Sequence, residues 1–236
     1  MTRTKSLLVI LGSLVAIAGA AFPAVAQKPA DGQGAGWQTW LAELDPPGPV
    51  SRPAPALTAG YLPHTPGVDR ANTTTEFDES GNRDRETLRR CEQRAKGVIA
   101  SRVVQVETFP TSSRRTCVKF SVAPNEWSES ITTYDVTDGF VRIGYPEDAK
   151  KPDAPVTCFN VLKVGAKPGD RWGSVPGKTE VDREYKTYGM YKGKPCVVIT
   201  GEGSYTILVE GFGKVLERSY KKKGDKWLLS TERKYE

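Results

Sequence analysis

The chain has 236 residues, of which 34 are Lys or Arg and 28 are Asp or Glu, so its net charge at pH 7 is +6. So mild a basic excess favours solubility and weak attraction to anionic surfaces, but it excludes the densely basic surface of a nucleic-acid-binding protein. The sequence holds one histidine, which excludes a zinc site built from several histidines.

The first 26 residues have the three parts of a secretory signal peptide. Arg3 and Lys5 give a positive start, residues 7–21 are mostly apolar, and Ala24-Val25-Ala26 is the small-x-small pattern of a cleavage site. The apolar run is shorter than the ~20 residues that span a bilayer. We therefore expect cleavage before Gln27, no transmembrane segment after signal removal, and an exported protein that is periplasmic or extracellular.

Residues 27–82 have the composition of a disordered, proline-rich tail or linker. Eight of the seventeen prolines fall between residues 27 and 86, and residues 72–75 form the polar run Asn-Thr-Thr-Thr. Such a composition buries too little apolar surface to offset the entropy lost on ordering.

One part of this tail has a helical pattern. Trp37, Trp40, Leu41 and Leu44 are spaced at i, i+3, i+4 and i+7, which places them on one face of a short helix. Such a helix could dock on the protein's own core or anchor a partner or a membrane surface. The first alternative is favoured, because so short a helix needs tertiary contacts to form.

The predicted folded domain covers residues 83–236 and opens with a short helix. Leu88, Cys91 and Ala95 have helical spacing within the charged segment 83–96, and Gly97 is a suitable stop. The interleaved charges indicate a solvated helix with local ion pairs.

After Gly97 the pattern changes to strands. Apolar and polar residues alternate or β-prone residues cluster over residues 98–109, 117–123, 131–136, 140–145, 156–164, 179–191, 196–200, 204–209, 214–220 and 227–235. Asp138-Gly139 is a strong hairpin signal, and Lys221, Lys222 and Lys223 precede a second turn at Gly224. The chain is therefore predicted to be mainly β, an antiparallel meander that forms a curved sheet or a partly open barrel.

Four cysteines, Cys91, Cys117, Cys158 and Cys196, are present. An even number in an exported chain favours two disulfides. Four cysteines allow three pairings; the positions in the meander favour Cys158 with Cys196 and Cys91 with Cys117.

Three turn motifs resemble a group of exported bacterial β-rich domains of unassigned function. They are residues 134–139, the Lys-Pro-Gly-Asp-x-Trp turn at 167–172 after a Val-Leu-Lys-Val strand, and Gly211-Phe212-Gly213-Lys214-Val215. The resemblance covers about residues 98–236 and implies a β-rich fold but no catalytic residues. Cys158 and Cys196 replace aliphatic residues of that group, which suggests a local disulfide variation.

Few residues point to catalysis. His64 lies beside prolines in the predicted tail, where it could not be held against a nucleophile. Glycosidases need only two carboxylates across a cleft, and Glu184, Glu202 and Glu210 lie on or next to predicted strands. The glycine pairs at 201–203 and 211–213 do not complete a dinucleotide-binding motif, and we expect no cofactor.

Two hypotheses follow. The favoured one is a non-enzymatic exported domain that binds an apolar ligand, a wall polymer or a protein of the cell envelope. Aromatic residues on the predicted strands could form a binding strip, although packing in the sheet is their more common role: Tyr185, Tyr188, Tyr191, Tyr205, Tyr220 and Trp227. The alternative is a carboxylate-dependent hydrolase that acts on glycans.

Overall fold

The computed structural model describes residues 39–45, 53–110, 116–122, 129–147 and 155–236. The predicted signal peptide, its cleavage site and Trp37 lie outside the described residues. Among the described residues, no helix has the length and apolar character needed to cross a membrane.

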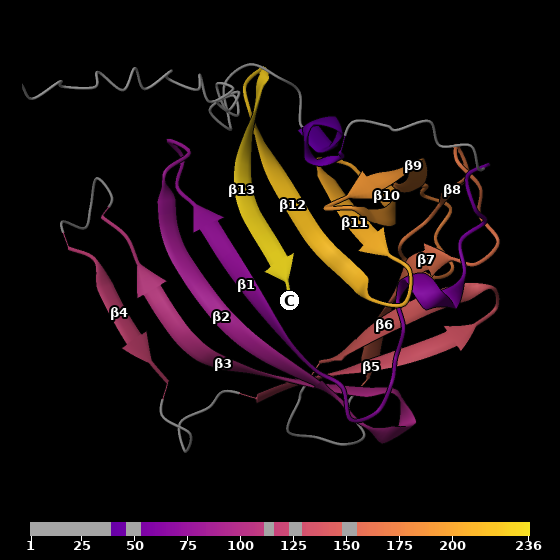
Figure 1. Ribbon diagram of the computed structural model, residues 1–236, viewed down its shortest axis with the longest axis horizontal. Helices are drawn as coiled ribbons and strands as arrows, with labels where there is room; N and C mark the ends of the chain where they lie inside the picture. Colours follow the sequence, from indigo (N-terminus) through magenta and orange to yellow (C-terminus); the bar gives the residue numbers. More distant parts are fainter. Residues whose placement is uncertain (1–38, 46–52, 111–115, 123–128, 148–154) are drawn as a thin grey trace, which may run out of the picture. The chain divides into compact units, whose positions relative to one another are not determined.

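The described residues form thirteen strands and three short 3-10 helices (Figure 1). The helices are η1 (Thr39–Glu43), η2 (Ala59–Tyr61) and η3 (Ala95–Gly97). The strands are β1 (Asp69–Phe77), β2 (Arg83–Gln93), β3 (Val98–Thr108), β4 (Val118–Ser121), β5 (Glu129–Thr137), β6 (Phe140–Pro146), β7 (Val156–Lys163), β8 (Arg171–Trp172), β9 (Arg183–Tyr191), β10 (Lys194–Gly201), β11 (Ser204–Val209), β12 (Gly213–Lys223) and β13 (Lys226–Tyr235).

These strands make one antiparallel sheet that is nearly closed into a barrel. Its order is β7-β6-β5-β3-β2-β1-β13-β12-β11-β10-β9-β8, with β4 paired to β3 beside this path. Most sequence neighbours pair, but β5 pairs with β3 and not with β4, and β7 and β8 lie at the two ends of the order. The first strand also pairs with the last, with Thr74 opposite Arg233. At the two ends of this order, the Asn160 N–H on β7 donates to the Ser174 carbonyl just after β8, at 2.6 Å. The predicted meander is confirmed.

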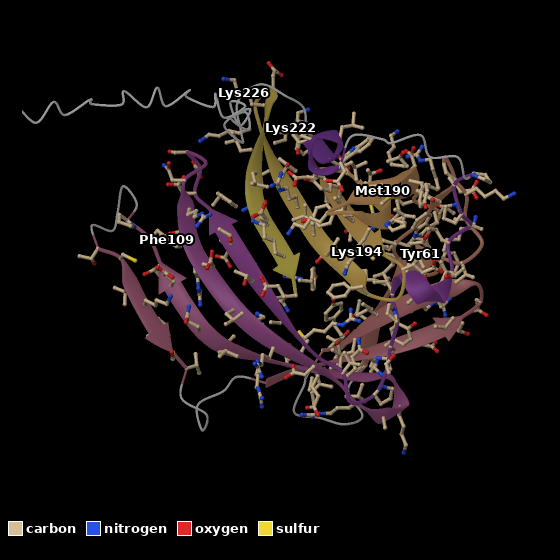
Figure 2. All side chains as sticks on the ribbon, viewed as in Figure 1. Tyr61, Phe109, Met190, Lys194, Lys222 and Lys226 are labelled. Atoms are coloured by element: carbon tan, nitrogen blue, oxygen red, sulfur yellow. The ribbon has the colours of Figure 1, made fainter. Side chains whose placement is uncertain are left out.

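Two predicted hairpins are found where the turn residues indicated. Asp138 and Gly139 both have positive φ, 51° and 75°, between β5 and β6, as a two-residue turn of matching twist requires. The lysine-rich run reaches the turn between β12 and β13, where Lys222 and Lys226 lie at the end of the hairpin (Figure 2). The residues at these two turns thus predicted both hairpins correctly.

The helix predicted over residues 83–96 is wrong, because residues 83–93 form strand β2. This strand pairs with β1 on one side and β3 on the other. Both of its faces carry mainly polar side chains, so it lacks the apolar alternation of an ordinary strand. Helix formers such as Arg, Glu and Gln then dominate its composition, and pairing with both neighbours overrides their propensity.

The disordered tail predicted over residues 27–82 is also wrong for residues 53–82. The polar run at 72–75 lies in strand β1, and Asn72, Thr74 and Thr75 are buried. Threonine is β-branched and suits a strand, and the turn around Gly81 connects β1 to β2. These two signals were present in the sequence, but the neighbouring prolines outweighed them.

The sheet is covered on both faces in its C-terminal half. On one face, Leu57, Tyr61 and Leu62, from the segment around η2, pack against Val197 and its neighbours. Val198, the next residue, faces the other way and belongs to a second cluster. The segment 53–62 therefore fills part of the space that the sheet encloses (Figure 2, Tyr61).

The second cluster contains Trp40, so the segment predicted as a short helix docks on the protein's own sheet. The indole is 7% exposed, and Glu43 of the same segment forms an ion pair of 2.8 Å with the buried Arg218. Asp45 continues the attachment, because its backbone N–H donates to the Met190 carbonyl and its carboxylate accepts from the Gly193 N–H. The element is a 3-10 helix of five residues and not an α-helix.

The predicted disulfides are not formed, since all four cysteines are free. Cys91 pairs with Ser101 on β3, whereas Val118, next to Cys117, pairs with Thr108. Seven residues along a strand span about 23 Å, far more than the ~7 Å that a disulfide can bridge.

The other predicted pair is also separated by the fold. Cys196 lies on β10, fully buried in the cluster that contains Trp40, whereas Cys158 lies on β7 opposite Gly144. Burial raises the pKa of the Cys196 thiol to about 12, so this thiol stays protonated at neutral pH.

Candidate functional site

A cavity of about 490 Å³ lies within the nearly closed sheet. Tyr134 and Tyr145, from β5 and β6, line it together with Lys214 and Tyr235, from β12 and β13, although these strand pairs are far apart in the sheet order. They can meet only across the enclosed space. Its volume is in the range of small-molecule sites in proteins.

The cavity wall is apolar over a large part of its area. Its apolar and aromatic members come from the loop before β1 and from β3, β5, β6 and β13, and they are Leu62, Pro63, Ile99, Ile131, Tyr134, Ile143, Tyr145, Pro146 and Tyr235. Leu62 also belongs to the apolar cluster around η2. The segment that fills one part of the enclosed space thus forms a wall of the part that stays open.

Four cations line the same cavity, namely Arg70, Arg89, Lys214 and Arg233. Its remaining polar members are neutral, and they are Asn72, Cys91, Gln93, Ser101, Ser130 and Thr132. Among the described residues that line it, none is an aspartate or a glutamate. The site is therefore amphipathic and positive.

Two of the four cations share a carboxylate that lies behind the cavity wall. Glu217 accepts from the Lys214 Nζ at 2.7 Å and pairs with the Arg233 Nη1 at 3.5 Å. The Tyr235 hydroxyl also donates to Glu217. Burial alone would raise the pKa of Glu217, but the charge and hydrogen bond of Lys214, with Tyr235 and Arg233, lower it to about 2.

Arg70 is held by an aromatic ring and a glycine. Its guanidinium lies 4.6 Å from the centroid of the Phe212 ring. A Cβ on Gly213 would lie 3.2 Å from the Arg70 Nη1, and Gly213 has a φ of +98°. The positive φ favours glycine at position 213, and a side chain there would also crowd the guanidinium.

Arg89 reaches the cavity from the neighbouring strand. The register places Arg70 opposite Cys91 and Asn72 opposite Arg89, so Arg70 and Arg89 are diagonal neighbours on one face. Diagonal residues of an antiparallel pair are about 7–8 Å apart, within reach of long side chains. Both residues therefore belong to one wall of the cavity.

Among the four cysteines, only Cys91 lines the cavity. Its thiol accepts a hydrogen bond of 3.2 Å from the Asn72 Nδ2. Burial raises its pKa, so the thiol is mainly protonated at neutral pH and is a poor nucleophile. Cys117, Cys158 and Cys196 lie elsewhere.

Glu184, Glu202 and Glu210, the carboxylates singled out in the sequence, do not line the cavity. Glu184 forms an ion pair with Lys186 on β9, and Glu202 lies exposed in the turn between β10 and β11. Glu210 is exposed after β11 and accepts a long hydrogen bond from Thr58.

His64 is not in a disordered tail, as the sequence suggested. Its Nε2 lies 2.9 Å from the Arg94 carbonyl, and its ring stacks on Tyr134 with centroids 4.9 Å apart. These contacts position the loop that carries Pro63 at the cavity.

The strand aromatics singled out in the sequence pack in the sheet and do not form one strip. Tyr185 and Tyr188 belong to or pack on the cluster around η2, whereas Tyr191, Tyr205 and Tyr220 belong to or pack on the cluster that contains Trp40. Trp227 packs near Gly203. These aromatic residues therefore pack within the sheet and do not form a binding strip.

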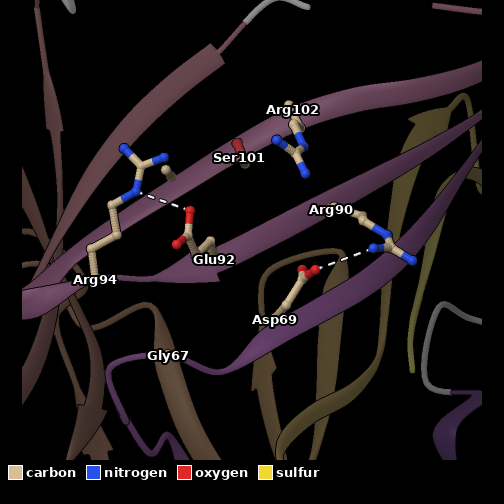
Figure 3. Close-up of a pocket in the computed structure, with 8 residues that line it drawn as sticks. Gly67, Asp69, Arg90, Glu92, Arg94, Ser101 and Arg102 are labelled. Carbon is tan, nitrogen blue, oxygen red and sulfur yellow. Dashed lines mark hydrogen bonds and ion pairs between the residues drawn. The ribbon is translucent and has the colours of Figure 1, made fainter. Parts of the chain in front are cut away.

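A second depression, of about 250 Å³, lies over β1, β2 and β3 (Figure 3). Arg90 pairs with Asp69 at 3.3 Å, and Arg94 pairs with Glu92 at 3.0 Å. Its charges are thus largely matched and exposed, as in a solvated strand surface.

Arg70 and Arg89 are two cations of the cavity wall that the sequence did not indicate. They fall in segments predicted as a tail and as a helix, so neither prediction placed them on one wall. A comparison of the chain with protein-family models, curated proteins and solved structures finds no match.

Proposed function

We propose that this chain is an exported, non-enzymatic β protein that binds a small amphipathic molecule within its nearly closed sheet. The observation that carries the proposal is the cavity, which combines an apolar wall with polar and cationic groups. Such a site buries the apolar part of a ligand and orients its polar part. The signal-like N-terminus and the resemblance to exported β-rich domains support a role in the periplasm or outside the cell.

Binding is favoured over hydrolysis of glycans. A glycosidase places two carboxyl groups about 5–9.5 Å apart across its cleft, whereas no described residue that lines the cavity is acidic. Glu217, the carboxylate that pairs with two of the cations lining the cavity, is engaged with Lys214 and Tyr235. Its low pKa also makes it a poor proton donor at neutral pH.

A small ligand is favoured over a wall polymer or a protein partner. A polymer needs an open groove or a flat aromatic strip, and the strand tyrosines pack in two clusters on opposite faces of the sheet. An envelope component could still act as donor or acceptor of the ligand.

The proposal is tested with the neutral fluorescent probe N-phenyl-1-naphthylamine. The wild type should bind it saturably with enhanced fluorescence, and I143W, which fills the cavity, should bind at least about tenfold more weakly, a loss of about 1.4 kcal/mol. The control is V136W, because Val136 lies on the adjacent strand β5 but is exposed; its affinity should stay within about twofold of the wild type.

Circular dichroism and thermal melts should show that both variants fold. I99F offers a smaller change on β3 if I143W is unstable. Absence of saturable binding by the wild type, or equal binding by the folded variants, would overturn the proposal.

A further inference from the structure

The cations of the cavity are unequally matched by carboxylates. Lys214 and Arg233 share Glu217. In the described part of the chain, neither Arg70 nor Arg89 forms an ion pair with an acidic side chain, although both are partly buried. A partly desolvated guanidinium without a counter-charge is unfavourable unless something else supplies the charge.

The surroundings of Arg70 make the lack of a carboxylate partner more unfavourable. Burial lowers its pKa, which means that the cavity stabilises its charge less well than water does. Arg89 is its diagonal neighbour on the same face and lines the same cavity. An anion in the cavity would provide the counter-charge that both lack and offset the desolvation.

The contacts of Arg70 leave its donors available. The Arg70 guanidinium lies over the Phe212 ring, and a contact of this kind with the ring face needs no hydrogen-bond acceptor, so N–H groups stay free for a ligand. The planar edge of a guanidinium matches two oxygens of a carboxylate or a phosphate. Phe212 and Gly213 therefore hold Arg70 in a position from which it can bind an acidic group.

We propose that the ligand of this cavity is an anionic amphiphile, with one apolar chain or ring system and one carboxylate or phosphate group that Arg70 and Arg89 bind together. The apolar part would lie along Ile99, Ile143 and Tyr134. This inference rests on the proposed function and adds the chemical class of the ligand.

The test compares ligands that share one chain but differ in the head group. Dodecanoate, dodecyl phosphate and dodecanol, each below its micellar concentration, compete with N-phenyl-1-naphthylamine at pH 7.5. The wild type should bind the two anions at least about tenfold more tightly than the alcohol, as for a charge-assisted pair. The double variant R70Q/R89Q should lose this preference and still bind dodecanol and the probe as the wild type does.

R90Q is the matched control. Arg90 follows Arg89 in the sequence but lies on the opposite face, paired with Asp69 (Figure 3). This variant should keep the full preference for the anions, and the single variants R70Q and R89Q should be intermediate.

The outcomes separate the two proposals. Equal binding of dodecanoate and dodecanol by the wild type, or an unchanged preference in R70Q/R89Q, would overturn the anionic head group but leave the binding function intact. No binding of the probe or of any of the three ligands would overturn both. A stronger preference for dodecyl phosphate than for dodecanoate would assign the head group as a phosphate.

Discussion

Arg89 and Arg90 are adjacent in the sequence, and strand geometry places them on opposite faces of β2. Arg89 lines the cavity, whereas Arg90 pairs with Asp69 on the outer surface. A helix over residues 83–96 would instead have set them about 100° apart around its axis. Which of the two arginines lines the cavity therefore could not be predicted without knowing that residues 83–93 form a strand and not a helix.

Glu217 gives a prediction about stability and pH. Its pKa is about 2 in the folded protein, against an ordinary value of 4.5. A carboxyl group whose pKa is lower in the folded than in the unfolded protein stabilises the fold at pH values above its unfolded-state pKa. This stabilisation is lost as the pH falls from about 4.5 toward 2. The free energy of unfolding of the wild type should therefore decrease over this range, by on the order of 2 kcal/mol through Glu217.

Urea denaturation at a series of pH values checks this. E217Q should be less stable than the wild type at pH 7 and should lose less stability between pH 5 and pH 2. E202Q, which changes an exposed turn residue, should follow the wild type. Parallel profiles for E217Q and the wild type would contradict the account.

At the scale of elements, the strands after Gly97 could be predicted and those before it could not. Strands such as β11 alternate between two faces with different surroundings, and turns such as Asp138-Gly139 need positive φ. Strands β1 and β2 instead carry polar residues on both faces, because they supply much of the polar and cationic part of the cavity lining. The hydrophobic pattern is lost in the strands that carry these polar lining residues, and the remaining signals, the threonines of β1 and the turn at Gly81, are weaker.

The 3-10 helix η1 is the element whose docking is most readily tested. Trp40 is buried against the sheet, whereas Leu41, the next residue, is 66% exposed. W40A should lower the free energy of unfolding by about 3 kcal/mol or more, since it removes a large buried aromatic side chain. L41A should change it by less than about 0.5 kcal/mol.

Chemical denaturation of both variants measures the difference. Similar small effects of W40A and L41A would show that η1 is not docked on the sheet as described.

At the scale of the whole molecule, the meander was predictable but its closure was not. Closure depends on the pairing of β1 with β13, and β1 lies in a segment whose composition resembles a linker. The cavity exists only because the strands at the two ends of the chain meet. The residues that line it are therefore spread from Leu62 to Tyr235 and have no compact sequence motif.

The location of the bound ligand tests the central claim most directly. Dodecanoate added to ¹⁵N-labelled protein should shift the amide resonances of strands that line the cavity, with the largest changes near Arg70 and Arg89 and at Ile99 and Ile143. Exposed residues of β4, such as Val118 and Phe120, should remain unchanged. Shifts confined to β4 or to the outer face around Arg90, or no shifts at all, would contradict a binding site within the sheet.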